Sequence, residues 1–169
     1  MAISIAVLMW LHVFSAIGWM GAGLVFGMVI TPVMRALSPA TRSEVILKLF
    51  PKYIRFVQAF IGATLVFGVI LAAVMSNGNM AIFAPTNSFG LFITTGAILA
   101  LVTAAVAMGV VIPSAKKVYK LTEAMVKNPG PPPAELLKAS ARMGKGAVAG
   151  IILLVLVLIC MVAAPNIGF

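Results

Sequence analysis

Charged side chains are scarce in this chain, and acidic ones are the scarcest. Only three of the 169 residues are Asp or Glu against twelve Lys or Arg, and charged residues make up 9% of the sequence while hydrophobic ones make up 63%. A soluble domain carries roughly 25% charged residues, so this chain cannot cover a water-facing surface. The single cysteine, Cys160, excludes an intrachain disulfide. No phosphate-binding loop, carboxylate pair or nucleophile with a neighbouring base is present, which excludes a hydrolase or kinase and leaves no catalytic residue to assign.

The chain has instead several apolar runs that are long enough to cross a bilayer. A membrane-spanning helix needs about 20 apolar residues, and four runs meet this length: Ile3–Thr31, Ile54–Met75, Phe89–Ile112 and Ala147–Ala164. Such runs exclude a transmembrane barrel, whose strands alternate and are about half as long. The first run lacks a basic leader and is too long for a signal peptide, so we expect it to be retained. We predict an all-α, polytopic protein of the cell (cytoplasmic) membrane, a single domain over residues 1–169 built as a four-transmembrane-helix bundle.

The charged residues fall in two segments of the chain, residues 35–55 and residues 116–145, and the rest of the sequence has none. The positive-inside rule places both basic connections in the cytoplasm. The N- and C-termini and the Ser76–Ser88 connection are then outside. We expect the basic segments to bind anionic lipid. The net charge of +9 follows this topology and does not indicate a nucleic-acid partner.

Proline and capping residues indicate how the spans are connected. Thr31-Pro32 is expected to end the first span, and Ser38-Pro39 to start a short interfacial helix over residues 39–50, with Thr41-x-x-Glu44 resembling a capping box. Pro51 is expected to separate that helix from the second span. The third span is predicted to continue beyond the membrane to about residue 127, where the proline-rich stretch 128–133 breaks it. A helical stretch over residues 134–142 then leads into the fourth span.

Small residues recur at a spacing of four in three of the predicted spans. They are Gly23-x-x-x-Gly27, Thr64-x-x-x-Gly68 and Gly146-x-x-x-Gly150. Helices in a membrane approach each other closely at such positions. We interpret all three motifs as helix-packing sites.

The only histidine, His12, lies inside the first span, and no charged residue precedes Arg35. An ionisable residue within a span is by default a functional-site hypothesis. Residues three or four apart share a helix face, so His12 shares its face with Ala16, Trp19 and Gly23. This face suits a flat macrocycle, with His12 as the metal ligand and the small residues leaving room beside Trp19.

The plainer alternative is a neutral His12 that is hydrogen-bonded to a neighbouring helix, for example to Thr94 or Thr95. At 1.5 Å per residue, His12 lies about 13 Å below the outer end of its helix. The matching level in the second span is near Val66–Phe67. No other His, and no Met, Lys or Cys, is expected at this depth. If haem binds, its sixth position is therefore empty, filled by an offset Met, or supplied by another subunit.

The eleven methionines raise a third possibility. Thioethers are soft ligands that select Cu(I). Five methionines are expected in helices or loops toward the outer half of the membrane: Met9, Met20, Met75, Met80 and Met161. Methionine is also an adaptable apolar filler. No Met-x-Met or Met-x-x-x-Met cluster is present, which favours the filler interpretation.

The stretch LHVFSAIGWMGAGLVFGMVITPVMR resembles two related groups of membrane proteins. Leu11-His12, Trp19, Gly21–Leu24, Pro32 and a following basic residue are similar to helix 1 of the copper-resistance-D (CopD)-like proteins and of the HemJ-type protoporphyrinogen oxidases. In the second span, Arg55-Phe56 and the Thr64-x-x-x-Gly68 motif show a weaker likeness. The resemblance covers under half of the chain.

The HemJ-type group implies a b-type haem ligated by the helix 1 histidine, which maps onto His12, and the CopD-like group implies copper handling. This chain departs from both groups, because its third span has no lysine and no second histidine exists. Six-electron oxidation of a porphyrinogen is therefore poorly supported.

Three functional hypotheses follow from the sequence. The first is a small membrane haem b protein for electron transfer, haem handling or redox sensing, with His12 as axial ligand; if it is an enzyme, it is a haem-dependent membrane oxidoreductase. The second is a cofactor-free accessory subunit of a homo-oligomer or a larger membrane complex. The third is a Cu(I) transport or tolerance protein.

Overall fold

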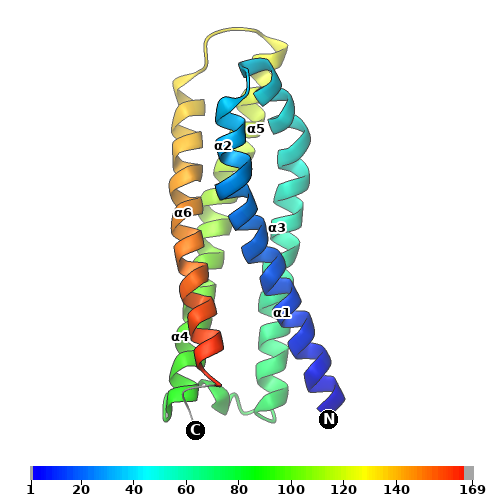
Figure 1. Cartoon of the computed structure of the whole chain (residues 1–169), viewed down its shortest axis with the longest axis vertical. Coiled ribbons are helices and arrows are strands. Elements are labelled where there is room, and N and C mark those ends of the chain that lie inside the picture. The colour runs from blue at the N-terminus through cyan, green and yellow to red at the C-terminus, as the bar shows by residue number, and fades with distance from the viewer. Residues whose placement is uncertain (1, 166–169) are drawn as a thin grey trace.

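The structure is a computed structural model that describes residues 2–165. All secondary-structure elements in these residues are helices or helical turns. Four helical rods run side by side (Figure 1). The first consists of α1 (Ala2–Val25), the π-helical turn η1 (Phe26–Ile30) and α2 (Thr31–Ala36), and the second is α3 (Pro39–Met75). The third consists of α4 (Ser88–Val106), the π-helical turn η3 (Ala107–Val111) and α5 (Ile112–Lys127), and the fourth is α6 (Ala134–Ala163). A short 3₁₀ turn, η2 (Ala81–Phe83), lies in the connection between the second and third rods.

Each rod is long and apolar enough to cross a membrane. The four candidate spans are 33, 37, 40 and 30 residues long within the described residues. This confirms the predicted all-α fold with four helices that are long and apolar enough to span a membrane. No strand occurs in residues 2–165.

The two ends of the bundle differ in charge. Figure 1 shows the start of α1, the end of α6 and the α3–α4 connection at one end, called here the loop end, and both basic connections at the other, called here the basic end. All charged residues thus belong to segments near the basic end, which is the separation that the sequence predicted. The assignment of this end to the cytoplasm remains a prediction.

The predicted break at Pro51 is wrong, because α3 runs without interruption from Pro39 to Met75. The expected interfacial helix over residues 39–50 is the first part of α3, and its apolar side packs in the bundle. Phe50 is 1% exposed, and Ile46 and Ile54 on either side of it are each 7% exposed. A proline in a helix removes one hydrogen bond, but burial of this continuous stripe keeps the helix intact.

The start of α3 is set by Ser38 rather than by a capping box at Thr41. The Ser38 side chain accepts a hydrogen bond from the Thr41 backbone N–H at 3.3 Å, and Pro39 occupies the first turn. Glu44 instead pairs with Lys48 one turn later. Ser38 is therefore the N-cap, a position that serine favours.

The predicted helix end at Thr31-Pro32 is also wrong, because the first rod continues to Ala36. The chain absorbs the proline by widening the preceding turn into η1, where the Thr31 N–H bonds to the Phe26 carbonyl, five residues back. The third rod does the same, since η3 precedes Pro113 and the Ile112 N–H bonds to the Ala107 carbonyl. Single π-helical turns of this kind are frequent at functional sites.

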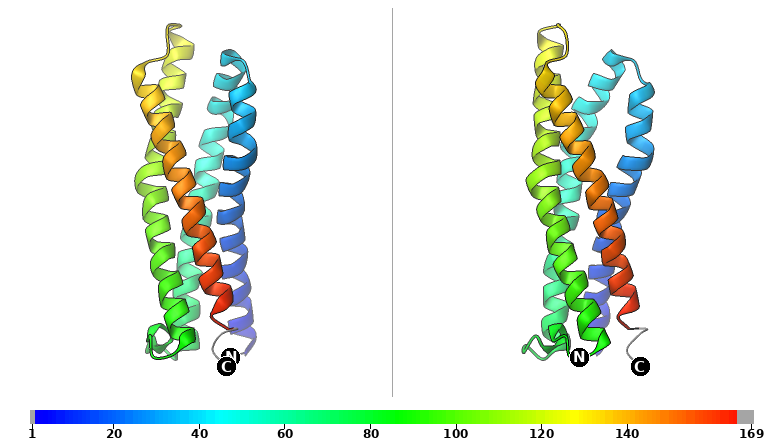
Figure 2. Two further views of the ribbon diagram at one scale, coloured as in Figure 1. Left: turned by 60° about the vertical axis from the view of Figure 1, so that its left-hand side comes forward. Right: turned by 90° about the vertical axis from the view of Figure 1, so that its left-hand side faces the viewer.

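The rods form two hairpins that meet along the bundle axis. In the first hairpin α1 packs mainly on α3, and in the second α4 packs mainly on α6. Figure 2 shows that α2 lies apart from α6 at the basic end. At mid-height all four rods meet around Trp19, which is 4% exposed and packs in one cluster with Val57, Ile61, Ala104 and Leu154.

The fourth rod, α6, begins at Ala134, before the predicted fourth span. Its first part is the helical stretch that was expected over residues 134–142. It continues without a break through Gly144 and Gly146 to Ala163. The connection before it is non-helical at Pro129–Pro133, as predicted. The Lys117 and Glu135 side chains join α5 to α6 by an ion pair of 2.7 Å close to this connection.

Candidate functional site

The structure places His12 in the seam between α1 and α3. Its Nδ1 atom lies 2.9 Å from the backbone carbonyl oxygen of Thr64. A carbonyl oxygen only accepts hydrogen bonds, so Nδ1 carries a proton and donates, and in the neutral form of the ring Nε2 is the atom with the free lone pair. The level on α3 agrees with the predicted level near Val66–Phe67. The partner is not Thr94, whose hydroxyl donates to the Phe83 carbonyl at 2.7 Å.

Gly68 supplies the space in which the imidazole lies. A Cβ atom at Gly68 would be 2.9 Å from Cε1 and 3.1 Å from Nδ1 of His12. Real Cβ atoms essentially never approach another atom that closely, so a larger residue here would displace the ring. The Thr64-x-x-x-Gly68 motif, predicted as a packing site, therefore holds His12. Sequence reasoning identified the motif but did not connect it with the histidine.

The three other residues of the predicted macrocycle face have different surroundings. Trp19 is buried in the four-rod cluster, and Gly23 lies beside Ile151 of α6, whose side chain would be 3.9 Å from a Cβ at this position. Ala16, between His12 and Trp19 along the helix face, is partly buried. Trp19 and Gly23 line a cavity, whereas His12 and Ala16 do not. His12 precedes Trp19 by seven residues, or about 10 Å of helix.

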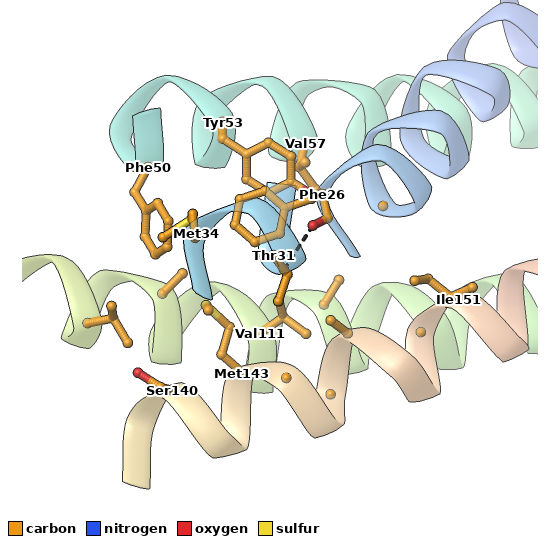
Figure 3. A pocket seen from close by; sticks show the side chains of 18 of the residues that line it. Phe26, Thr31, Met34, Phe50, Tyr53, Val57, Val111, Ser140, Met143 and Ile151 are labelled. Carbon is orange, nitrogen blue, oxygen red and sulfur yellow. Dashed lines mark hydrogen bonds between the residues drawn. The ribbon is translucent and has the colours of Figure 1, made fainter. Parts of the chain in front are cut away.

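The cavity has a volume of about 300 Å³ and lies between the two hairpins on the basic-end side of Trp19. All four rods contribute to its wall (Figure 3), and Phe26, Tyr53, Val111 and Ile151 are among the side chains that do so. Its lining also includes Met34 and Met143, whose side chains come from α2 and α6 on opposite sides. The sequence did not single out either methionine.

Both π-helical turns lie beside this cavity. Phe26 and Thr31 border it at the first turn, where the Thr31 hydroxyl donates to the Phe26 carbonyl at 2.8 Å. Ala107 and Val111 border it at the second. The turns widen the two rods at the same level, and α6 packs against both. A Cβ at Gly27 would be 3.0 Å from Ile151, which confirms the predicted packing role of Gly27.

Two arginines lie at the basic-end mouth of the cavity. The guanidinium of Arg42 donates to the carbonyl oxygens of Met34, Arg35 and Leu37 at 2.8, 3.1 and 3.1 Å, and so caps the C-terminal end of α2. The Arg35 side chain is exposed. The chain has three acidic residues, and each pairs with a lysine: Glu44 with Lys48, Glu123 with Lys127 and Glu135 with Lys117. None of these acidic side chains lines the cavity.

The outer methionines provide less support for a copper site. Met20 packs against the Trp19 cluster. The Met161 side chain fills the space over Gly96, with its Cε atom 2.9 Å from where a Cβ would lie. Both therefore serve as packing residues. Among residues 2–165, no group of three or more His, Cys, Asp or Glu is placed to hold a metal ion.

The fold and these sites define a class, a bundle of four helices long and apolar enough to cross a membrane, with one histidine in a helix seam and a cavity at its basic end. Comparisons with protein-family models, curated proteins and solved structures find no match to this chain. The likeness to the CopD-like and HemJ-type groups therefore depends only on the residues quoted from the first two spans.

Proposed function

We propose that this protein is a small membrane haem b protein with His12 as axial ligand. The observation that carries the proposal is the hydrogen bond from Nδ1 of His12 to the Thr64 carbonyl. Histidines that ligate metals almost always donate their other ring N–H to a carbonyl or carboxylate, which fixes the tautomer and the ring orientation. Here the bond leaves Nε2 as the ligating atom.

The residues around His12 fit this role. Gly68 leaves room for the imidazole, whose Cε1, Nδ1 and Nε2 atoms would be 2.9, 3.1 and 3.8 Å from a Cβ at that position, and His12 is only partly buried. Figure 1 shows α1 diverging from α6 toward the loop end. Trp19 separates His12 from the cavity, so the cavity is not assigned to the haem. The chain has no second histidine, so a sixth ligand is not assigned either.

A bound haem supplies one-electron transfer. The contribution of the chain is to orient His12, because the hydrogen bond to the Thr64 carbonyl fixes the position of the Nδ1 proton and of the ring. With no further titratable side chain beside His12, we propose electron transfer, haem handling or redox sensing in preference to proton-coupled catalysis.

The test is a reduced-minus-oxidised visible spectrum of detergent-purified protein expressed with ample haem. We expect a Soret band with sharp reduced α and β bands, and their loss in His12→Ala. Gly68→Ala should weaken the bands because the added methyl group displaces the imidazole. Gly62→Ala is the matched control on the same helix, since a Cβ at Gly62 meets nothing within 4 Å, and it should retain the full spectrum.

A colourless wild type, or a spectrum that survives His12→Ala unchanged, would refute the proposal. The colourless outcome would favour the accessory subunit, since a histidine that is hydrogen-bonded to a backbone carbonyl is also a self-contained packing element. Partner chains should then copurify with the protein. Metal analysis of the same sample decides the copper alternative.

A further inference from the structure

The cavity at the basic end has no part in the proposed haem site. Its closed end is formed by Trp19 and Leu154, which are 4% and 8% exposed. Its open end lies at Arg35 and Gly144, which are both exposed. The cavity therefore extends along the bundle from a charged mouth to an apolar floor.

The mouth is complementary to an anion. Arg42 already donates to three carbonyl oxygens, but its positive charge is not neutralised by a carboxylate. Arg35 has no acidic partner among the residues that the structure describes, because all three acidic side chains form ion pairs elsewhere. Two positive charges and no negative one therefore border the opening.

The interior is complementary to a hydrocarbon chain. Most of the lining side chains are aliphatic or aromatic, and one wall, formed by α6, includes glycines. A Cβ at Gly144 or Gly150 would meet nothing within 4 Å, so this wall leaves space unfilled. The volume of about 300 Å³ is at the lower end of the range for ligand pockets, which suits one slender chain better than a ring system.

We infer that the cavity holds one hydrocarbon chain of an anionic phospholipid, with the phosphate at Arg35 and the chain extending toward Trp19. Basic pockets between transmembrane helices at the positively charged end of a bundle are known to bind such head groups. The membrane supplies the ligand at high local concentration. This inference does not depend on haem binding, because His12 lies on the other side of Trp19.

Tryptophan fluorescence can report directly on whether a lipid hydrocarbon chain occupies the cavity. The protein has two tryptophans: Trp19 at the cavity floor and Trp10, which is 63% exposed on the outside of α1. In Trp10→Phe protein, Trp19 is the only reporter, and in Trp19→Phe protein, Trp10 reports bulk lipid. Each protein is reconstituted into vesicles that contain brominated phosphatidylglycerol or brominated phosphatidylcholine, because bromine on a lipid chain quenches a tryptophan that it contacts.

We expect brominated phosphatidylglycerol to quench Trp19 at a lower mole fraction than brominated phosphatidylcholine does. Arg35→Gln should reduce this preference about fivefold, which is the effect of one cationic side chain on anionic lipid. Gly150→Leu should abolish Trp19 quenching by filling the cavity, whereas Gly109→Leu should not. Gly109 is the control because it also has free space around it and does not line the cavity. Trp10 should be quenched equally by both lipids in every variant.

Three results would overturn the inference. Trp19 quenching that is equal for both lipids would remove the role of the anionic head group. Quenching that persists in Gly150→Leu would show that the lipid reaches Trp19 by another path. Quenching by brominated oleic acid, but not by brominated phosphatidylglycerol, would identify a free fatty acid as the occupant.

Discussion

The α1–α3 seam at the loop end and the cavity at the basic end are built in opposite ways. In the seam, glycines let large rings lie directly on a helix backbone. Gly68 accommodates His12, and a Cβ at Gly18 would be 2.3 Å from the Phe60 ring. Around the cavity, glycines such as Gly150 face open space instead. The same residue type thus marks close approach at Gly18 and Gly68 and unfilled volume at Gly150.

The comparison shows that a glycine motif alone does not indicate what its residues do. Gly146 and Gly150 form one predicted packing motif on α6. A Cβ at Gly146 would be 3.0 Å from Val111, so Gly146 packs as expected, whereas a Cβ at Gly150 would meet no atom within 4 Å. Whether a glycine allows close approach depends on the side chains of the neighbouring helix. A motif within one helix carries no information about those side chains.

The largest loss of stability is expected from truncating a buried aromatic side chain beside the cavity. Phe50→Ala removes a side chain that is 1% exposed and contacts the ring of Phe26, with centroids 5.7 Å apart. We expect a loss of about 3–5 kcal/mol in the free energy of unfolding, since the cavity would be enlarged. SDS titration of the protein in dodecyl maltoside micelles, followed by circular dichroism, measures this change. Phe14→Ala, at a site that is 50% exposed, is the control and should cost much less.

A smaller loss of stability is expected from adding a methyl group in the α1–α3 seam, because the seam has no room for it. Gly18→Ala should destabilise the protein by about 1–3 kcal/mol, because the Phe60 ring must move. Gly21→Ala on the same helix should not, since a Cβ there meets nothing within 4 Å. The same titration compares the two variants, and equal stabilities would contradict the close contact between α1 and α3.

An increase in stability is expected for a substitution in the cavity wall. Gly150→Ala adds a methyl group to free space and replaces a poor helix former by a good one. We expect the free energy of unfolding to rise by up to about 1 kcal/mol. A clear destabilisation in the titration would show that the space beside Gly150 is filled by protein atoms.

The smallest effect is expected for the ion pair between Lys117 and Glu135. The hydrogen bond from Lys117, and then its charge, lower the pKa of Glu135, but both side chains are exposed. A lowered carboxyl pKa stabilises the fold above the unfolded pKa and stops doing so as the pH falls through the folded value. Solvent screens this exposed pair, so Glu135→Gln should leave the unfolding midpoint unchanged at neutral pH. A resolved shift would show that the pair fastens the α5–α6 connection.

Several features were predictable because they depend on residues close together in the chain. Ser38-Pro39 indicated a helix start, and the 128–133 stretch indicated a break, since capping groups and prolines act within a turn or two. The depth of His12 on α3 followed from helical rise alone. Its partner did not, because the Thr64 carbonyl is a backbone group that no sequence motif distinguishes.

The continuity of α3 through Pro51 illustrates why other features were not predictable. A proline costs a helix about 3 kcal/mol, which locally favours a break. Burial of Phe50 and its neighbours against the other rods outweighs this cost, and burial depends on where those rods lie. The widened turns before Pro32 and Pro113 likewise preserve rods that local rules would end.

The amino-acid sequence by itself determined the number of apolar helices and the concentration of charge at one end, because hydropathy and charge are summed along each segment whatever surrounds it. Tertiary structure alone decided that His12 donates to Thr64, that Gly68 cradles its ring, and that Trp19 separates this site from a cavity with two arginines at its mouth. These features depend on which side chains of different rods face each other, and that is set by the packing of the whole bundle.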